Sequence, residues 1–159
     1  MEQKYSAPVD KVFALLTDPR WLEARCLALG ELSASVKAKK AGKGVAISMK
    51  RRVKRELPAL VAKVMPSEAD LVFEEPWGPD EDGVRSGTLS MSAVGQPITM
   101  TANFELAPAG KGSLYRITHV CKCSVPLVGG AVAKFAQGQV EEGCAAELAY
   151  LVDYLKKHK

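Results

Sequence analysis

The last third of the chain constrains the fold most, because an alternating strand pattern leads directly into a long helical one. The strand ends near Val125, and Pro126 and Gly129–Gly130 separate it from about 28 residues of helical pattern. The apolar stripe of this helix, at spacings of three and four, consists of Val132, Phe135, Ala136, Val140, Cys144, Leu148, Leu151, Val152 and Leu155. Such a stripe has to be buried. We expect it to lie on the concave side of a sheet, an arrangement that commonly encloses a cavity.

The rest of the chain predicts a first strand at residues 2–6, two short helices and about six further strands. Ser6 and Asp18 are the expected caps of the two helices. The alternation is clearest from Ile98 to Leu106. Short turns join the strands, so the sheet should be antiparallel, with one apolar face. We predict an α+β domain over residues 1–159, with a curved sheet of about seven strands wrapped around the C-terminal helix.

Length and composition fit one globular domain that is large enough to bury a core. No apolar run approaches the roughly 18–20 residues needed to span a bilayer, and the first residues show no signal-peptide pattern. We therefore expect a cytoplasmic protein without a membrane span. In that compartment Cys26, Cys121, Cys123 and Cys144 should be free thiols.

Charge is distributed unevenly along the chain. Residues 37–55 carry only basic charges, and residues 68–82 carry only acidic ones. The basic segment could bind an anionic partner, but we favour pairing of opposite charges on neighbouring strands and expect no nucleic acid. Arg51 and Arg55 share the phase of inward-facing residues, which would require a carboxylate from Glu74, from Glu75 or from a ligand. We favour a bulge, or a strand that extends into water.

The element order, together with residues 5–19 (YSAPVDKVFALLTDP) and 21–30 (WLEARCLALG), resembles the START-like (SRPBCC, helix-grip) superfamily. Plant Bet v 1-type allergens and polyketide cyclases share this fold. The second segment looks like an uncharacterised actinobacterial branch, a domain of unknown function. The resemblance implies a deep hydrophobic cavity between the curved sheet and the last helix. Superfamily members bind lipids, sterols, hormones or polyketides, and a minority catalyse cyclisation or hydrolysis. No catalytic motif carries over.

The candidate ligand-binding residues are those expected to face this cavity from the strands and the last helix. They are Met49, Phe73, Met91, Met100, Phe104, Tyr115, Ile117, His119, Cys121, Phe135, Gly138 and Gln139. The expected partner is a small hydrophobic molecule, and no cofactor is expected. The sequence leaves the oligomeric state open.

His119 is the weak catalytic candidate, since alternation places it on the apolar face, where an imidazole can act as acid or base near neutral pH. The preferred alternative is a histidine hydrogen-bonded in the core, or one at a strand end with its ring near solvent. A metal site with Cys121 and Cys123 is not expected, because three same-face residues on one strand span about 13 Å.

Two further features have open interpretations. Gly138 and Gly143 each cost the last helix about 1 kcal/mol. They could let the helix approach the sheet, leave room for a ligand, or be tolerated weak points. The segment from Pro76 to Gly83 reads as a loop whose Trp77 could gate the cavity or pack on the surface.

The leading functional hypothesis is binding of a small hydrophobic ligand, such as a lipid, sterol or polyketide-like molecule, without catalysis. The first alternative is a cyclase or hydrolase that uses His119. The second is an interaction module that binds an anionic partner through the basic strands 37–55.

Overall fold

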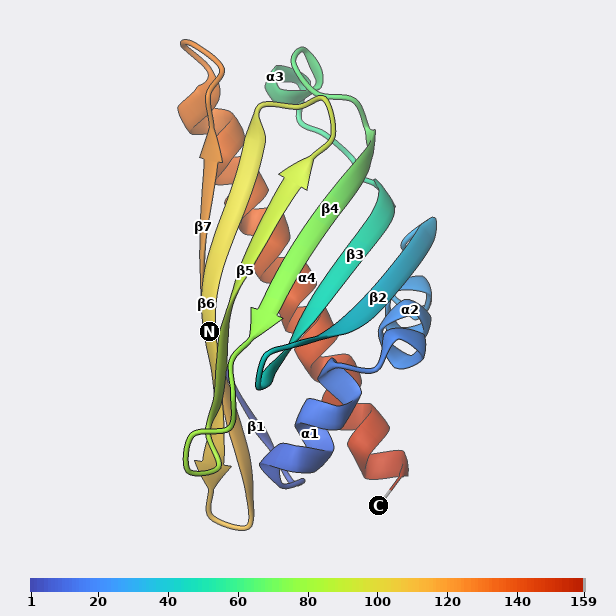
Figure 1. The fold of residues 1–159 in the computed structure, drawn as a ribbon. Coiled ribbons are helices and arrows are strands. Elements are labelled where there is room, and N and C mark those ends of the chain that lie inside the picture. The colour runs from blue at the N-terminus through green and yellow to red at the C-terminus, as the bar shows by residue number, and fades with distance from the viewer. Residues whose placement is uncertain (159) are drawn as a thin grey trace.

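The computed structural model describes residues 1–158, which form a seven-stranded sheet and four helices (Figure 1). In chain order the elements are β1 (Glu2–Tyr5), α1 (Val9–Leu16), α2 (Pro19–Ala28), β2 (Ser33–Ala41), β3 (Gly44–Lys54), α3 (Ala59–Ala62), β4 (Glu68–Trp77), β5 (Arg85–Ala93), β6 (Ile98–Ala109), β7 (Gly112–Cys123) and α4 (Gly129–Lys157). The predicted α+β fold, with its open antiparallel sheet and long C-terminal helix, is confirmed. Within the described chain, no helix is long and apolar enough to cross a membrane.

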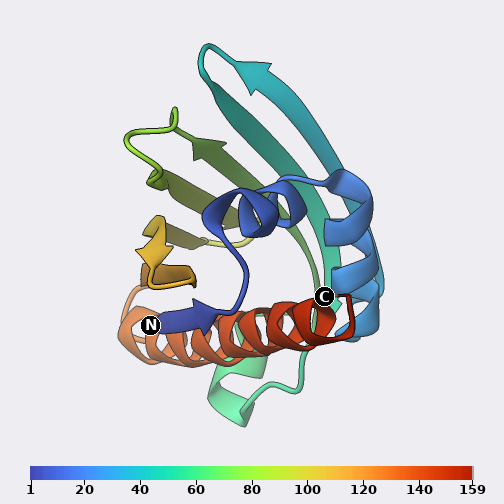
Figure 2. The same cartoon turned by 90° about the horizontal axis from the view of Figure 1, so that it is seen from below.

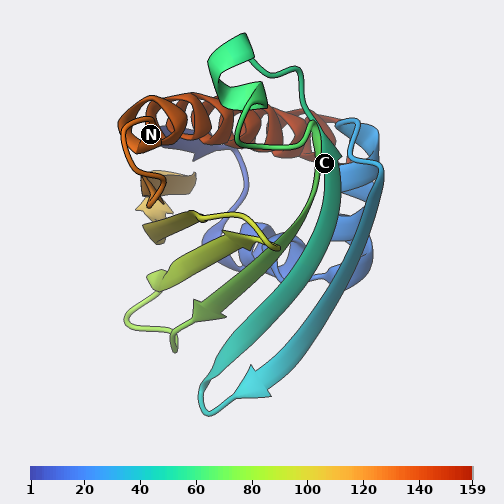
Figure 3. The same cartoon turned by 90° about the horizontal axis from the view of Figure 1, so that it is seen from above.

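The sheet has the strand order β1-β7-β6-β5-β4-β3-β2, and every neighbouring pair is antiparallel. Viewed along its length from either end, the sheet curves toward α4, which lies across the concave side (Figures 2 and 3). Helices α1 and α2 lie near the C-terminal end of α4, and α3 lies near its beginning (Figure 1). The helices therefore cover one face of the sheet.

Helix α4 is packed firmly only toward its two ends. Near its beginning Val132 is buried in a small cluster with Val61 and Ile98. Near its end the main core buries Leu148, Leu151 and Leu155, each of which contributes roughly 1.5–3 kcal/mol when fully buried. The members of the stripe between these regions, from Phe135 to Cys144, are only half-buried. The predicted stripe thus faces the sheet, but protein side chains do not fill the space between its middle part and the strands.

Several local predictions can be compared with the structure. The Asp18 carboxylate caps α2 by accepting from the backbone N–H groups of Arg20 and Trp21, as expected. The prediction that Ser6 caps α1 was wrong. Pro8 holds the N-cap position of α1, and no side chain hydrogen-bonds to the start of this helix. Trp77 is the buried last residue of β4, so it is neither a gate nor part of a surface loop. Its burial follows from alternation with Phe73 and Glu75.

The opposite charges of neighbouring strands do pair, as favoured. Arg52 on β3 lies 3.0 Å from Glu68 and 3.1 Å from Asp70, both on β4, on the solvent face of the sheet. Exposed pairs of this kind contribute at most about 1 kcal/mol each. They neutralise part of the basic segment, while lysines such as Lys39 and Lys43 remain exposed.

Two glycines test this packing. A Cβ at Gly87 would overlap the Pro76 carbonyl oxygen and the Phe104 ring, so Gly87→Ala should lower the free energy of unfolding by about 1–3 kcal/mol.

A Cβ at Gly138 would meet no heavy atom within 4 Å, so Gly138→Ala should raise the free energy of unfolding by about 1 kcal/mol. Urea unfolding measures both. Equal effects of the two substitutions would contradict the described packing.

Candidate functional site

A cavity of about 200 Å³ lies between the concave face of the sheet and α4. It occupies the region where the middle of the helix is only half-buried. Its apolar walls include Leu71 and Phe73 of β4, Met91 of β5, Met100 of β6 and Val140 of α4. The cavity exists because α4 spans the curved sheet, and side chains fill the space beneath it only toward its ends.

The structure divides the predicted ligand-binding residues into two groups. Those in the cavity wall are Phe73, Met91, Met100, Tyr115, Ile117, His119, Phe135 and Gln139. The structure places Met49, Phe104, Cys121 and Gly138 outside the wall. Alternation and helical phase identify the face of an element, but not how far along it the cavity extends.

Each residue outside the wall has another environment. The Met49 sulfur accepts from the Cys26 thiol and from Arg51 Nε. The Phe104 ring packs on Trp77, with centroids 4.5 Å apart. Cys121 is half-buried, and its backbone N–H donates to the side chain of a glutamine in α4. The open space at Gly138 and Gly143 shows that neither glycine is needed for close approach of helix and sheet.

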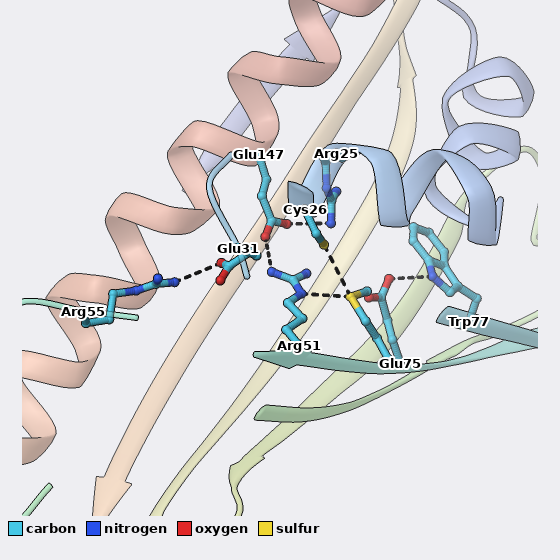
Figure 4. Close-up of polar contacts among 9 residues, drawn as sticks. Arg25, Cys26, Glu31, Arg51, Arg55, Glu75, Trp77 and Glu147 are labelled. Atoms are coloured by element: carbon cyan, nitrogen blue, oxygen red, sulfur yellow. Dashed lines mark hydrogen bonds and ion pairs between the residues drawn. The ribbon is translucent and has the colours of Figure 1, made fainter. Parts of the chain in front are cut away.

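The sequence did not predict the main polar feature of the cavity, an ion triad formed by Arg25, Arg51 and Glu147 (Figure 4). One Glu147 oxygen lies 2.8 Å from Arg25 Nη2, and the other accepts from Arg51 Nη1. The two arginine side chains are only 7% and 9% exposed. Arg51 therefore does point inward, so the favoured bulge was wrong, and its partner is Glu147 rather than Glu74 or Glu75.

The triad is charged at neutral pH. Burial alone would raise the pKa of Glu147, but the charges of Arg25 and Arg51 more than offset it and lower that pKa to about 2. Two arginines and one carboxylate leave one excess positive charge beside the cavity. The Arg51 guanidinium also lies over the Phe73 ring, 4.5 Å from its centroid, which stabilises a desolvated cation.

Glu75 is another carboxyl group of the wall, and it behaves differently from Glu147. It is half-buried on β4 and accepts from Trp77 Nε1 at 2.8 Å (Figure 4). Burial raises its pKa to about 7, although the charge of Arg25 opposes this. Glu75 forms no ion pair among the described residues. It can therefore gain or lose a proton near neutral pH.

His119 lies in the cavity wall and is half-buried. Burial lowers its pKa, and the charge of the N-terminus adds to this effect, so the imidazole is neutral at pH 7. Within residues 1–158 its ring forms no hydrogen bond, although its backbone carbonyl accepts from Gln137. No group of three or more histidine, cysteine or acidic residues in this range is placed to hold a metal ion.

A polar groove adjoins the cavity. The two spaces share Glu31, Arg51, Arg55, Gln139, Gly143 and Glu147 in their walls. Arg55 Nη2 lies 2.9 Å from Glu31, so this pair ties the end of β3 to the segment after α2 (Figure 4). Arg55 follows the last residue of β3 and is partly exposed, in keeping with the favoured extension toward water, although its side chain also reaches the cavity wall and pairs with Glu31. The groove places this side of the cavity close to solvent.

These features together form a helix-grip, START-like fold, as predicted from the sequence. The chain belongs to a family described as a protein of unknown function (DUF2505), which matches residues 1–155. A member of this family therefore has a curved sheet, a long C-terminal helix and a cavity between them.

The chain is also similar to curated mycobacterial proteins over about half of its length. The uncharacterised proteins Mb0491c of Mycobacterium bovis and Rv0481c of Mycobacterium tuberculosis are each 25% identical over 88 residues, which are 54% of this chain and 51% of theirs. The matched part thus spans about half the length of these curated relatives.

Three solved structures share the fold at low sequence identity. Protein Ms6760 of Mycobacterium smegmatis has a TM-score of 0.61 at 12% identity, covering 99% of this chain and 90% of its own. An uncharacterised Rhizobium leguminosarum protein has a TM-score of 0.61 at 12% identity, covering 99% and 92%. The Bet v 1-like Ara h 8.0201 has a TM-score of 0.57 at 14% identity, covering 96% and 95%.

Glu147→Gln should be strongly destabilising, because it leaves two buried guanidinium groups without their counter-charge. We expect the free energy of unfolding at neutral pH to fall by about 3–5 kcal/mol. Below the unfolded pKa of about 4.5 the loss should shrink, because Glu147 of the wild type becomes protonated as the pH approaches 2. Glu142→Gln, on the exposed side of α4, is the control and should change stability little. Equal stability of the two variants would contradict the triad's importance.

Glu75→Gln should have the opposite pH dependence. The folded protein holds the Glu75 proton more tightly than the unfolded chain does, so wild-type stability should fall as the pH rises from about 4.5 to 7. The glutamine variant loses this penalty and should gain up to about 3 kcal/mol over wild type above pH 7, with little difference near pH 4. Urea unfolding across this range measures it. The exposed neighbour control, Glu74→Gln, should show no such trend.

Proposed function

We propose that the protein binds a small, mainly hydrophobic molecule in the cavity between the sheet and α4. The observation that carries this proposal is the cavity of about 200 Å³, whose wall is largely apolar and formed by side chains of both layers. Apolar cavities with a few polar groups are the usual form of small-molecule sites. The half-buried Val140 and Cys144, in the middle of the helix stripe, would gain burial from such a ligand.

The cavity size favours a compact ligand. Pockets for drug-sized molecules usually have volumes of about 300–1,000 Å³, so this one is comparatively small. Among the lipid, sterol and polyketide-like classes, a compact ring system fits this volume better than a long acyl chain or a complete sterol. Flexible methionines in the wall, Met65, Met91 and Met100, would adapt to such a shape.

The two alternative functions have weaker support. An enzyme that uses His119 would need a second polar group within hydrogen-bond reach of the ring, and the described residues supply none. A module that binds anions through residues 37–55 would depend on its exposed lysines, because its arginines are already paired: Arg51 with Glu147, Arg52 with Glu68 and Asp70, and Arg55 with Glu31. Hydrophobic ligand binding therefore remains the proposal.

Val140→Trp tests the proposal by filling the cavity from α4. The probe is N-phenyl-1-naphthylamine, a neutral apolar fluorophore whose own emission reports binding. We expect saturable binding to wild type and at least about tenfold weaker binding to Val140→Trp, because the indole occupies the ligand's space. Glu141→Trp, on the next and exposed residue, should bind like wild type. Unchanged binding by Val140→Trp, or no binding by wild type, would refute the proposal.

A further inference from the structure

We propose that Tyr5, Glu75 and Tyr115 form a subsite that binds a hydroxyl group of an otherwise apolar ligand. The inference rests on the proposed function and narrows its ligand class. All three side chains belong to the cavity wall, although they come from the separate strands β1, β4 and β7. They bring hydrogen-bonding groups to a surface that is otherwise mostly apolar.

Tyr5 gives the first reason. It is the last residue of β1 and only 4% exposed. Its hydroxyl oxygen is buried and has no hydrogen-bond partner among residues 1–158. Buried polar groups are nearly always paired, because an unpaired one loses its bonds to water without replacement. A hydroxyl that lies unpaired in a cavity wall is therefore a group to which a ligand can bond.

Glu75 gives the second reason. One of its carboxylate oxygens accepts from Trp77 Nε1, while the other has no partner among the described residues. The indole fixes the orientation of the carboxyl group, and the Trp77 side chain is itself held between Phe13 and Phe104. The unpaired oxygen is thus a positioned acceptor that a ligand O–H can approach.

Tyr115 completes the subsite. Its ring is stacked on Phe104, with centroids 6.0 Å apart, so a row of aromatic rings joins it to Trp77 beside Glu75. Burial is the main cause that raises the pKa of Tyr115, and the charge of Glu75 and, to a smaller extent, Tyr5 add to this effect. The three groups therefore act on one another electrostatically, in keeping with a common polar region of the wall.

The chemistry of these groups favours a hydroxyl. A ligand O–H can donate to the Glu75 carboxylate and accept from a tyrosine O–H, which uses both kinds of group. A ketone can only accept, which leaves the Glu75 carboxylate unpaired in its ionised form, the form that predominates above pH 7. A ligand carboxylate would be repelled by the negative charge of Glu75. The nearby guanidinium groups of Arg25 and Arg51 would offer it little compensation, because they are already paired with Glu147. Arg25 Nε has no hydrogen-bond partner in the part of the chain that the structure describes, so an anion is the alternative that the experiment has to test.

Three probes of similar shape test the subsite: 2-naphthol, 2-methylnaphthalene and 2-naphthoate. For wild type we expect 2-naphthol to bind about tenfold more tightly than 2-methylnaphthalene, and 2-naphthoate to bind most weakly. Tyr5→Phe, Tyr115→Phe and Glu75→Leu should each reduce the preference for the hydroxyl to about threefold or less. Their affinity for 2-methylnaphthalene should fall less than their affinity for 2-naphthol, because only the naphthol loses a hydrogen bond.

The outcomes separate this subsite from the proposed function. Binding of 2-naphthol and 2-methylnaphthalene with equal affinity overturns the subsite and leaves a purely apolar cavity. The tightest binding by 2-naphthoate overturns it in favour of an anion site at Arg25. No binding by any probe overturns the proposed function as well. The control Tyr150→Phe, outside the wall, should keep the full preference.

A stability measurement excludes a merely structural effect. Tyr5→Phe removes a hydroxyl that has no partner in the free protein, so its unfolding midpoint should equal or exceed that of wild type while its hydroxyl preference falls. A loss of both stability and affinity for all probes would show that Tyr5 acts through packing, and would overturn its assigned role.

Discussion

The ion triad of Arg25, Arg51 and Glu147 is the interaction on which the arrangement around the cavity depends. It joins α2, β3 and α4, three elements that are distant in the chain, at a point where apolar packing is incomplete. Both guanidinium groups are almost fully buried, so the carboxylate between them is indispensable even if the triad as a whole adds little net stability. Its geometric effect is to fix α4 above the sheet.

This arrangement explains how a cavity survives in a domain of this size. Close packing would normally fill the concave side of a curved sheet. Here α4 is held by Val132 near its beginning and by Leu148, Leu151 and Leu155 near its end, and the triad fixes it close to the second group. Between these anchors the side chain of Gln137 reaches β7 and hydrogen-bonds to the backbone of His119 and Cys121, while the cavity lies beside this contact. Ligand binding would then fill an existing space without requiring α4 to move.

Much of the fold could be predicted from periodicity. Alternation identified the inward faces of the strands, and the spacing of three and four identified the buried stripe of α4. The Asp18 cap followed from a local rule, because the side chain bonds to the backbone two and three residues away. The Ser6 cap failed on the same rule, because Pro8 takes the N-cap position. Local signals are reliable only where tertiary packing does not change the backbone around them.

The polar part of the site could not be predicted in the same way. Arg51 was in phase with inward residues, but its partner Glu147 is 96 positions away, and a glutamate in an apolar stripe reads as an interruption. Arg25 sits beside the buried Cys26 on a short helix with no distinctive pattern. The extent of the cavity could not be predicted from the alternation of the strands either. Met49 and Met91 both face inward, but only Met91 belongs to the cavity wall.

The methionines provide the most direct test of the central claim that the cavity binds a hydrophobic molecule. Met65, Met91 and Met100 line the cavity, whereas Met1 and Met49 do not. In a protein labelled with ¹³C at the methionine methyl groups, titration with N-phenyl-1-naphthylamine should shift the three cavity resonances and leave Met1 unchanged. Saturation with a single affinity would support the account. Shifts confined to Met1, or no shifts at all, would contradict it.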